Sequence, residues 1–264
     1  MTGYPVEASR EMIEAGVFYG RKKSNTNPKM RAYVLANRGG IEIINLQKTG
    51  EMLEAATAFI KEKVRNGSLV LLVGTMPTAD GAVANVAKRF GLPYVTVRWV
   101  GGAITNFKNI SKRVEHLVKL RTDLASGALE KYTKKERLDM EREMHRLEEL
   151  MGGLEAMTRE PDLIVMVDPV MHVTAVNEAR TRRIPIVALA NVDADPDTID
   201  YVIPGNDKAK KSIEWFMQKI EAAIEEGMKL RAAQEAQVAA ANAEKAEKAE
   251  QANKAAAAAP AKAQ

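Results

Sequence analysis

Short, mostly apolar segments alternate along this chain with longer amphipathic ones. The apolar runs have the length of β-strands and lie at 41–45, 69–73, 94–97, 163–167 and 185–190. Amphipathic segments with helical spacing lie at 48–66, 78–90, 173–182 and 207–227. Runs that are apolar at nearly every position are typical of parallel strands covered on both faces. The alternation therefore predicts an α/β fold built on a doubly wound parallel sheet.

One crossover is much longer than a connection within a sheet requires. About 65 residues separate the 94–97 strand from the 163–167 strand, where roughly 10–15 would suffice. Thr133 and Glu136 within this insert have the spacing of a helix capping box. Apolar residues recur there at three- and four-residue steps, at Phe107, Ile110, Val114 and Leu117 and again at Met140, Met144, Leu147, Met151 and Leu154. The pattern predicts an antiparallel helical hairpin, zipped like a coiled coil and protruding from the sheet domain.

The C-terminal segment 229–264 has a different composition from the rest of the chain. It holds 17 alanines in 36 residues and almost no large apolar side chain. Such a segment favours helix but has nothing with which to form a core. We therefore expect an α/β domain made of 1–103 and 157–228, a hairpin insert at 104–156, and a tail that is helical in part or disordered.

The residue inventory excludes several kinds of site. The chain has no cysteine, and its three histidines, His116, His145 and His172, lie far apart in sequence. A disulfide scaffold, a thiolate metal site and a histidine-rich metal site are therefore not expected. No apolar run approaches the roughly 20 residues of a membrane-spanning helix, and residues 1–10 lack the pattern of an export signal. We expect a cytoplasmic protein with no metal and no cofactor.

The loop after the 69–73 strand is the first place where an α/β enzyme would hold a ligand. Residues 74–81 lack the G-x-G-x-x-G spacing of dinucleotide sites and the Gly-Lys-Ser/Thr of a nucleotide P-loop. A helix that starts near Thr78 could still offer its amides to an anion. A tight turn capped by Thr78 or Asp80 is the interpretation that the residues favour.

Aspartates gather around the fourth and fifth predicted strands. Their positions are Asp162, Asp168, Asp193, Asp195, Asp197 and Asp200. Asp168 directly follows a strand, where α/β enzymes place carboxylates, so a magnesium site or an acid/base pair is one interpretation. Turn and capping roles are the other, and Asp195-Pro196-Asp197 favours them. The chain has neither a G-x-S-x-G nucleophile elbow nor a cysteine nucleophile.

Basic residues form two clusters, and both have features of a nucleic-acid contact. The first spans 21–38, contains no acid, and has the amides and glycines of a loop; its candidate residues are Arg21, Lys22, Lys23, Asn27, Lys29, Arg31 and Arg38. The second lies at the root of the hairpin, beside Gly101 and Gly102; its candidate residues are Arg98, Trp99, Asn106, Lys108, Lys112 and Arg113. Lysine and arginine with polar amides are the residues that contact phosphate backbones. A solvated face for the first cluster, and a Trp99 that caps the junction of hairpin and sheet, are the alternatives.

The second cluster also carries a resemblance. Arg98-Trp99-Val100-Gly101-Gly102-Ala103-Ile104-Thr105-Asn106 matches the arginine-tryptophan-x-glycine-glycine-x-x-threonine-asparagine signature of the bacterial ribosomal protein S-two family. Further matches follow in the right order, among them Asn27-Pro28-Lys29-Met30, Thr133-Lys134-Lys135-Glu136 and Ile203-Pro204-Gly205-Asn206-Asp207. The chain departs from the family at Phe18 and Arg21, where histidines are usual, and at Met76, where lysine is common. The resemblance covers about residues 8–228.

The resemblance implies a flavodoxin-like α/β domain with a protruding helical hairpin. It further implies a structural constituent of the small ribosomal subunit, with ribosomal RNA and neighbouring ribosomal proteins as partners, including the large RNA-binding protein S-one. No catalytic activity and no small-molecule substrate would then be expected.

Two other classes of function remain open from the residues alone. One is a nucleotide- or phosphosugar-binding enzyme that uses the strand ends near Gly74, Asp168 and Asp193. The other is a scaffold that binds other proteins through the hairpin without RNA.

Overall fold

A five-stranded parallel sheet forms the centre of the molecule, as a computed structural model describes it for residues 6–257, with side chains for 9–129 and 131–237. The strand order is β5-β4-β6-β7-β8, and every neighbouring pair is parallel. The strands are β4 (Val70–Val73), β5 (Tyr94–Val95), β6 (Leu163–Val167), β7 (Ile186–Ala190) and β8 (Tyr201–Pro204). All residues of β4, β6 and β7 are buried. The predicted α/β class and parallel sheet are therefore confirmed.

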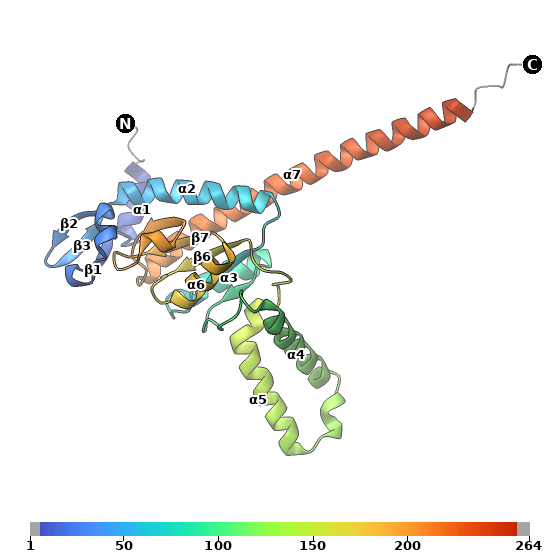
Figure 1. Ribbon diagram of the computed structural model, residues 1–264, viewed down its shortest axis with the longest axis horizontal. Helices are drawn as coiled ribbons and strands as arrows, with labels where there is room; N and C mark the ends of the chain where they lie inside the picture. The colour runs from blue at the N-terminus through green and yellow to red at the C-terminus, as the bar shows by residue number, and fades with distance from the viewer. Residues whose placement is uncertain (1–5, 258–264) are drawn as a thin grey trace, which may run out of the picture.

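Helices cover both faces of this sheet (Figure 1). They are α1 (Val6–Glu14), α2 (Leu46–Arg65), α3 (Asp80–Phe90), α4 (Phe107–Ala125), α5 (Lys134–Met151), α6 (Val173–Arg182) and α7 (Lys210–Ala257). Successive strand residues point to opposite faces, so Leu72 and Val165 pack with α2, α3 and α7, whereas Leu71 and Ile164 pack with α6 and the ends of α4 and α5. This division explains why the strands are apolar at every position.

The segment 41–45 does not belong to the parallel sheet, and here the sequence-based prediction is wrong. It forms β3 (Ile41–Ile44), the central strand of a separate antiparallel sheet of order β1-β3-β2. Its partners are β1 (Tyr19–Lys22) and β2 (Val34–Arg38). Gly39 and Gly40 both adopt positive φ, at 60° and 81°, and join β2 to β3 through two residues. A two-residue connection can pair strands only antiparallel.

The fifth parallel strand is instead β8, which the sequence analysis did not predict. It has only four residues, follows an aspartate-rich turn and ends in Pro204. Its pairing with β7 places Tyr201 beside Val187 and Pro204 beside Ala190. Proline is tolerated there because β8 is an edge strand and lacks a further partner on its outer side in the described sheet.

The helix boundaries follow the predictions closely except at the C-terminus. The predicted 173–182 helix is α6 without change, and the predicted 48–66 and 78–90 helices are α2 and α3 shifted by one or two residues. The predicted 207–227 helix continues as α7 to Ala257 and projects away from the domain beyond its contact with α2 (Figure 1). Residues 229–257 of the tail are helical in this structure, and 258–264 lies outside the described residues.

The long crossover contains the two predicted helices, α4 and α5, which contact each other and project from the sheet domain (Figure 1). The Thr133 capping box is confirmed: the Thr133 amide donates to the Glu136 carboxylate at 2.9 Å, and the Glu136 amide donates back to the Thr133 hydroxyl at 3.4 Å. The short helix η3 (Ala128–Lys131) joins α4 to α5, and η4 (Gly152–Leu154) follows α5.

The predicted apolar seam divides into two parts. Leu117, Leu120 and Met144 form a small cluster of their own between α4 and α5, flanked by partly buried residues that include Leu147. The root residues pack with the sheet face instead; they are Phe107, Ile110, Val114, Met151 and Leu154. The seam thus joins the helices to each other at its outer part and to the sheet at its base.

Candidate nucleic-acid interface

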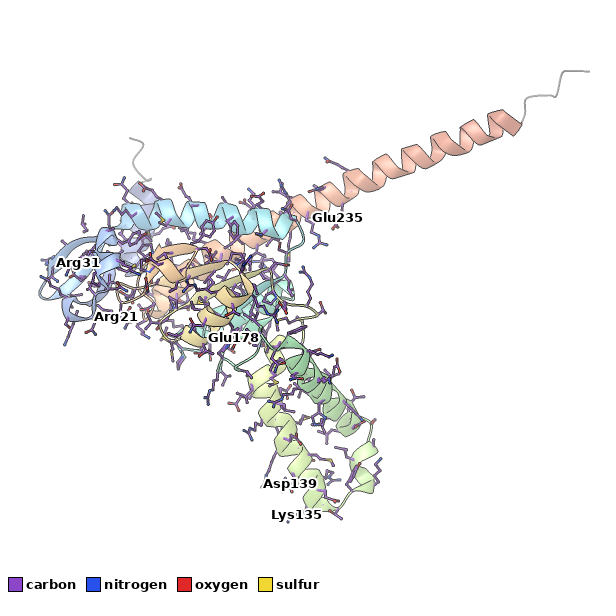
Figure 2. All side chains as sticks on the ribbon, viewed as in Figure 1. Arg21, Arg31, Lys135, Asp139, Glu178 and Glu235 are labelled. Atoms are coloured by element: carbon purple, nitrogen blue, oxygen red, sulfur yellow. The ribbon has the colours of Figure 1, made fainter. Side chains whose placement is uncertain are left out.

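Four cations of the N-terminal cluster lie exposed on or beside the antiparallel sheet. Their side chains form no ion pair with any carboxylate that the structure describes; they are Lys22, Lys23, Arg31 and Arg38. Arg31 belongs to η2 (Pro28–Tyr33), at the end of the molecule formed by β1, β2 and β3 (Figure 2). A group of unneutralised exposed cations is the charge arrangement that a polyanion requires.

Arg21 and Lys29 do not share this free surface. Arg21 is 24% exposed and pairs through Nε with Asp193 at 2.7 Å and through Nη2 with Asp207 at 2.9 Å. Lys29 Nζ pairs with Asp195 at 3.0 Å and with Asp197 at 2.6 Å. Both cations were predicted RNA contacts, but the structure turns them toward aspartates at the strand ends. Sequence distance concealed these pairs, which join residues more than 160 positions apart.

Asn27 has a local structural role at the same place. Its side chain accepts a hydrogen bond from the Lys29 amide at 3.0 Å and so caps η2. The backbone amide of Asn27 donates a hydrogen bond to the Val192 carbonyl at 2.8 Å. These two bonds fasten the basic segment to the loop after β7.

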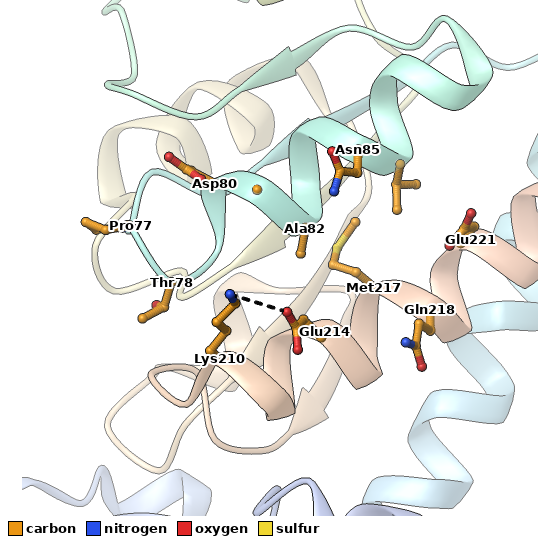
Figure 3. Close-up of a pocket in the computed structure, with 12 residues that line it drawn as sticks. Pro77, Thr78, Asp80, Ala82, Asn85, Lys210, Glu214, Met217, Gln218 and Glu221 are labelled. Carbon is orange, nitrogen blue, oxygen red and sulfur yellow. Dashed lines mark ion pairs between the residues drawn. The ribbon is translucent and has the colours of Figure 1, made fainter.

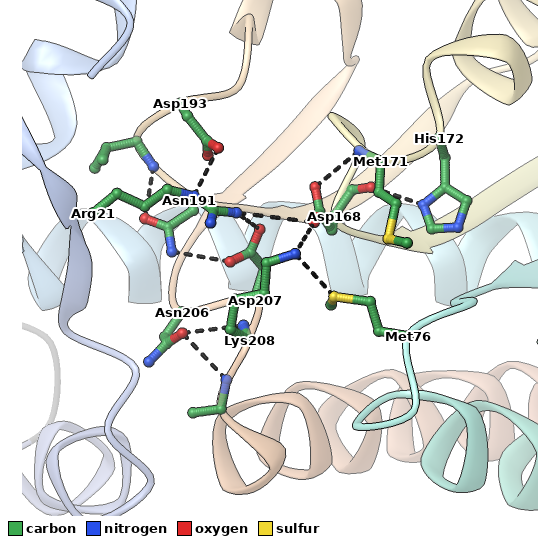
Figure 4. Close-up of polar contacts among 12 residues, drawn as sticks. Arg21, Met76, Asp168, Met171, His172, Asn191, Asp193, Asn206, Asp207 and Lys208 are labelled. Carbon is green, nitrogen blue, oxygen red and sulfur yellow. Dashed lines mark hydrogen bonds and ion pairs between the residues drawn. The ribbon is translucent and has the colours of Figure 1, made fainter. Parts of the chain in front are cut away.

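The aspartates at the strand ends have two kinds of role. Asp195 caps the short helix η5 (Pro196–Thr198), while Asp162 and Asp200 each accept a backbone amide, from Leu69 at 2.7 Å and from Ile186 at 2.8 Å. The predicted turn and capping roles are confirmed for these three. Asp168, Asp193 and Asp207 instead form an ion-pair network with Arg21 and Lys208 (Figure 4).

This network closes the edge at which an open α/β sheet usually holds a ligand. The ligand crevice of such sheets lies where the strand order reverses, here between β4 and β6. Lys208 Nζ lies there, 2.7 Å from Asp168 Oδ2 and 3.0 Å from Met76 Sδ. Thr75 Oγ1 and His172 Nε2 are 3.0 Å apart beside it, and burial lowers the pKa of His172. The protein's own side chains therefore occupy the position.

The loop between β4 and α3 is the predicted tight turn, but its cap differs. A Cβ at Gly74 would meet Val83 Cγ2 at 2.9 Å, which explains why glycine begins the turn. The N-cap residue is Ala79, and its side chain makes no capping bond, so neither Thr78 nor Asp80 caps α3. A pocket of about 340 Å³ adjoins this turn, between α3 and α7 (Figure 3). Its lining includes the Lys210–Glu214 pair, 3.8 Å apart.

The buried carboxyl of Asp207 predicts an unusual dependence of stability on pH. Burial, together with the charge of Asp168, raises the pKa of Asp207 from 3.8 to about 6, although Asn191, Arg21 and Lys208 oppose the shift. The native state then holds a proton that the unfolded state releases, so the contribution of Asp207 to stability falls as pH rises from about 4 to about 6. A pKa unit corresponds to about 1.4 kcal/mol, which gives a change of about 3 kcal/mol.

The measurement is the free energy of urea unfolding of the wild type and of Asp207→Asn, at several pH values between 4 and 7. We expect the stability of the wild type relative to Asp207→Asn to fall by about 3 kcal/mol as pH rises over this range. Asp195→Asn provides the contrast. The hydrogen bond from Lys29 lowers the pKa of Asp195, so the contribution of Asp195 to stability should instead be lost as pH falls. Parallel pH profiles for the two variants would contradict the assignment of the raised pKa to Asp207.

The second basic cluster surrounds the loop that leads into α4. Its exposed cations form no ion pair with a described carboxylate; they are Arg98, Lys108, Lys112 and Arg113. Asn106 is exposed and precedes the first turn of α4, and its side chain makes no capping bond. Arg98 lies in the loop before α4, and Lys108, Lys112 and Arg113 lie on the first two turns of α4, at the root of the projecting helices. This root lies apart from Arg31 (Figure 2).

Glu178 organises this loop, and the sequence analysis did not identify it. Its side chain belongs to α6, is 8% exposed, and accepts a hydrogen bond from Trp99 Nε1 at 3.0 Å. Burial would raise the pKa of Glu178, but the hydrogen bonds from Trp99 and from the amides of Gly102, Thr105 and Ile104 together lower it. Trp99 is half-buried and joins the loop to α6 through this hydrogen bond. This arrangement favours the alternative interpretation of Trp99, a residue at the structural junction, over a direct RNA contact. The signal in the sequence was an acid on the buried helical face that also carries Ala175 and Ala179.

Other chemistry has little support in the described part of the chain. No cluster of three or more histidine, cysteine, aspartate or glutamate residues there has the arrangement of a metal site. None of the described helices is both long enough and apolar enough to cross a bilayer. The fold and the site together define an α/β protein with a closed strand edge and two groups of free cations on its surface, the charge pattern of nucleic-acid-binding proteins.

Comparison with known proteins gives the family. The model of the family described as ribosomal protein S2 matches residues 12–227. A Thermus thermophilus relative is 44% identical over 216 residues, covering 81% of this chain and 84% of the relative. Relatives from Corynebacterium urealyticum, 42% identical over 88% of this chain and 86% of their own length, and from Geotalea uraniireducens, 40% identical over 84% and 87%, are similar to it as well. All three carry the name small ribosomal subunit protein uS2. The chain belongs to the ribosomal protein S2 family, the S-two family of the sequence signature.

Proposed function

We propose that this protein is a structural constituent of the small ribosomal subunit, where it binds ribosomal RNA and neighbouring ribosomal proteins. Family membership across most of the chain supports the assignment. The observation that carries the RNA contact is the pair of exposed cation groups, which no described carboxylate neutralises. Protein S-one is proposed as one neighbour on the family resemblance alone, and a cytoplasmic location follows from a place on the ribosome.

The proposed architecture is a flavodoxin-like domain that carries a coiled-coil hairpin. The strand order supports the first part, because it corresponds to the flavodoxin order 2-1-3-4-5 when the parallel strands are numbered along the chain. The separate apolar cluster between α4 and α5 supports an antiparallel coiled coil. The proposed division is 1–103 with 157–228 for the domain, including the basic segment 8–40, 104–156 for the hairpin, and 229–264 for the tail.

The set of residues that we propose to contact RNA is smaller than the set predicted from the sequence. The proposed set comprises Lys22, Lys23, Arg31 and Arg38 in one group and Arg98, Asn106, Lys108, Lys112 and Arg113 in the other. Arg21, Asn27, Lys29 and Trp99 support these surfaces through the internal contacts described above. Binding would rest on phosphate contacts and RNA shape, with little reading of bases, because cations dominate both groups.

A non-catalytic role is part of the proposal. Lys208, Met76 and the Arg21–Asp207 pair fill the strand edge that a nucleotide- or phosphosugar-binding enzyme would need. The aspartates there are engaged with cations or backbone amides, so none is presented to a substrate. No observation favours the enzyme or the RNA-independent scaffold as a second candidate.

Removing the first cation group is expected to reduce the salt dependence of RNA binding. Each phosphate contact releases condensed counterions, so the logarithm of affinity falls with the logarithm of salt concentration by about 0.7–0.9 per contact. Replacing Lys22, Lys23, Arg31 and Arg38 by alanine together should reduce the magnitude of that slope by about 3. The measurement is binding to small-subunit ribosomal RNA across a salt series, beside a thermal melt.

A charge-matched variant separates local contact from overall charge. Arg65, Lys88, Lys134 and Lys211 are exposed, form no ion pair with a described carboxylate and lie outside both groups. Their joint replacement by alanine removes the same charge and should leave the slope close to that of the wild type. Equal slopes in the two quadruple variants would show that only net charge matters, and the proposed contact surface would be wrong.

A further inference from the structure

The Glu178 carboxylate is the convergence point of five hydrogen-bond donors from one loop. Oε1 accepts from Trp99 Nε1 at 3.0 Å and from the Gly102 amide at 2.9 Å. Oε2 accepts from the Ile104 amide at 3.2 Å, the Thr105 amide at 3.2 Å and the Thr105 hydroxyl at 3.1 Å. No described cation pairs with Glu178, so neutral donors alone hold a nearly buried negative charge.

Without this carboxylate the loop would lose most of its anchors. Residues 98–106 belong to no strand or helix. Within the loop, the Ala103 amide donates to the Val100 carbonyl at 3.1 Å and the Asn106 amide donates to the Gly102 carbonyl at 2.9 Å. Gly102 adopts a φ of +85°, and the amides of Gly102, Ile104 and Thr105 point toward one side of the loop, as in the anion-binding concavities of other loops. A carboxylate from α6 fills the concavity here in place of an external anion.

The anchored loop determines where the second cation group points. Arg98 directly precedes Trp99, and Lys108 lies in the first turn of α4, just beyond Thr105. A second residue of α6 acts at the same place, because Arg182 Nη2 donates to the Thr105 carbonyl at 3.0 Å. Helix α6 therefore fixes both the entry to the loop and the start of α4, while the cations themselves stay exposed.

We propose that Glu178 is a positioning residue for RNA binding, which it supports from beneath the surface by holding the loop 98–106 so that Arg98, Lys108 and their neighbours on α4 address adjacent phosphates together. The inference rests on the proposed function. It differs from a direct contact, because Glu178 carries a charge that repels RNA and is only 8% exposed, with its carboxylate held by donors of the loop.

That sign of charge makes the test selective. Glu178→Gln removes one negative charge, and electrostatics alone would then tighten binding to a polyanion. A glutamine offers a single acceptor oxygen, and its NH₂ group would face donors, so the loop would lose its fixed shape. We expect the affinity for small-subunit ribosomal RNA to fall by about tenfold, and the magnitude of the salt slope to fall by about 1–2, at a temperature where a melt shows the variant folded.

Two comparisons show whether the loss acts through the loop. Arg98→Ala should weaken binding in the wild type but by much less in the Glu178→Gln background, since the two residues serve one contact. Glu115→Gln on α4 removes an exposed negative charge close by and should bind at least as tightly as the wild type. A purely structural role for Glu178 would lower the melting temperature and leave the salt slope of the folded protein unchanged.

A second variant covers the case in which Glu178→Gln does not fold. Trp99→Phe with Thr105→Val removes the two side-chain donors and keeps the carboxylate, an aromatic ring at position 99 and the side-chain size at position 105. A smaller loss in the same direction is expected. Affinity and salt slope equal to those of the wild type, in either folded variant, would overturn the inference. Absence of salt-dependent RNA binding by the wild type would instead refute the proposed function itself.

Discussion

Leu117→Asp is expected to melt α4 and α5 while the parallel sheet stays folded. Leu117 is fully buried in the small cluster between the two helices, and a charge placed there would have no partner. The loss of apolar burial and the burial of a charge cost several kcal/mol. Hydrogen exchange should show fast-exchanging amides over 113–125 and 134–148 and retained protection in β6 and β7, because the sheet is stabilised by its own two clusters.

Val118→Asp is the matched control for this prediction. Val118 is the next residue on the same helix and is 43% exposed, so its replacement should change stability by no more than about 0.5 kcal/mol. If α4 and α5 kept their protection in Leu117→Asp, the proposed coiled-coil pairing of the two helices would be wrong. Equal losses of protection in both variants would show that α4 and α5 are only marginally stable and that the apolar cluster is not what stabilises them.

Gly153→Ala is expected to destabilise the protein by about 3 kcal/mol through overpacking where η4 contacts β5. A Cβ at this position would overlap the carbonyl oxygen of Tyr94 and lie 2.9 Å from Cδ2 of its ring. Neither group can move freely, because Tyr94 belongs to β5 and its backbone is paired with β4. The strain should appear as a lower urea midpoint with an unchanged m-value.

The neighbouring glycine separates this steric effect from the general cost of adding a methyl group. At Gly152 the nearest atom to an added Cβ is Glu148 Cγ at 3.6 Å, which is an ordinary contact. Gly152 also has helical φ and ψ, so alanine should be neutral or slightly stabilising there. A similar loss in both variants would refute close packing of η4 against β5 as the cause.

Local patterns in the sequence predicted most of the fold, and the errors have a common physical origin. Helix α6, strand β6 and the Thr133 capping box depend on neighbours within a few residues, so periodicity and capping signals located them. Strand β8 was missed because four residues next to a turn carry almost no periodic signal. The 41–45 strand was placed in the wrong sheet because an apolar run does not say which partner it will have.

The sequence indicated the region of the candidate site, and the structure reduces the set of residues that we propose for it. The eight exposed cations come from the two clusters that composition and loop signals had indicated. Arg21 and Lys29 have the same residue types and neighbours in sequence, yet aspartates from far along the chain neutralise them. Only their pairing in space separates a cation that is free to bind phosphate from one that is already bound. Glu178 was missed for the same reason, since its five donors lie more than 70 residues away.

The contacts of Arg21 also set an order on biosynthesis. Its partner Asp207 lies 186 residues later in the chain. The carbonyl of Val17, in the same N-terminal segment, likewise accepts a hydrogen bond from the amide of Asn206. A chain made from its N-terminus exposes the basic segment first, long before β8 and the residues after it exist. During most of translation this basic segment therefore lacks its intramolecular partners and remains accessible to any nucleic acid nearby. Synthesis of the turn after β8 ends that period, because this turn supplies Asp207, the last of the carboxylates that Arg21 binds.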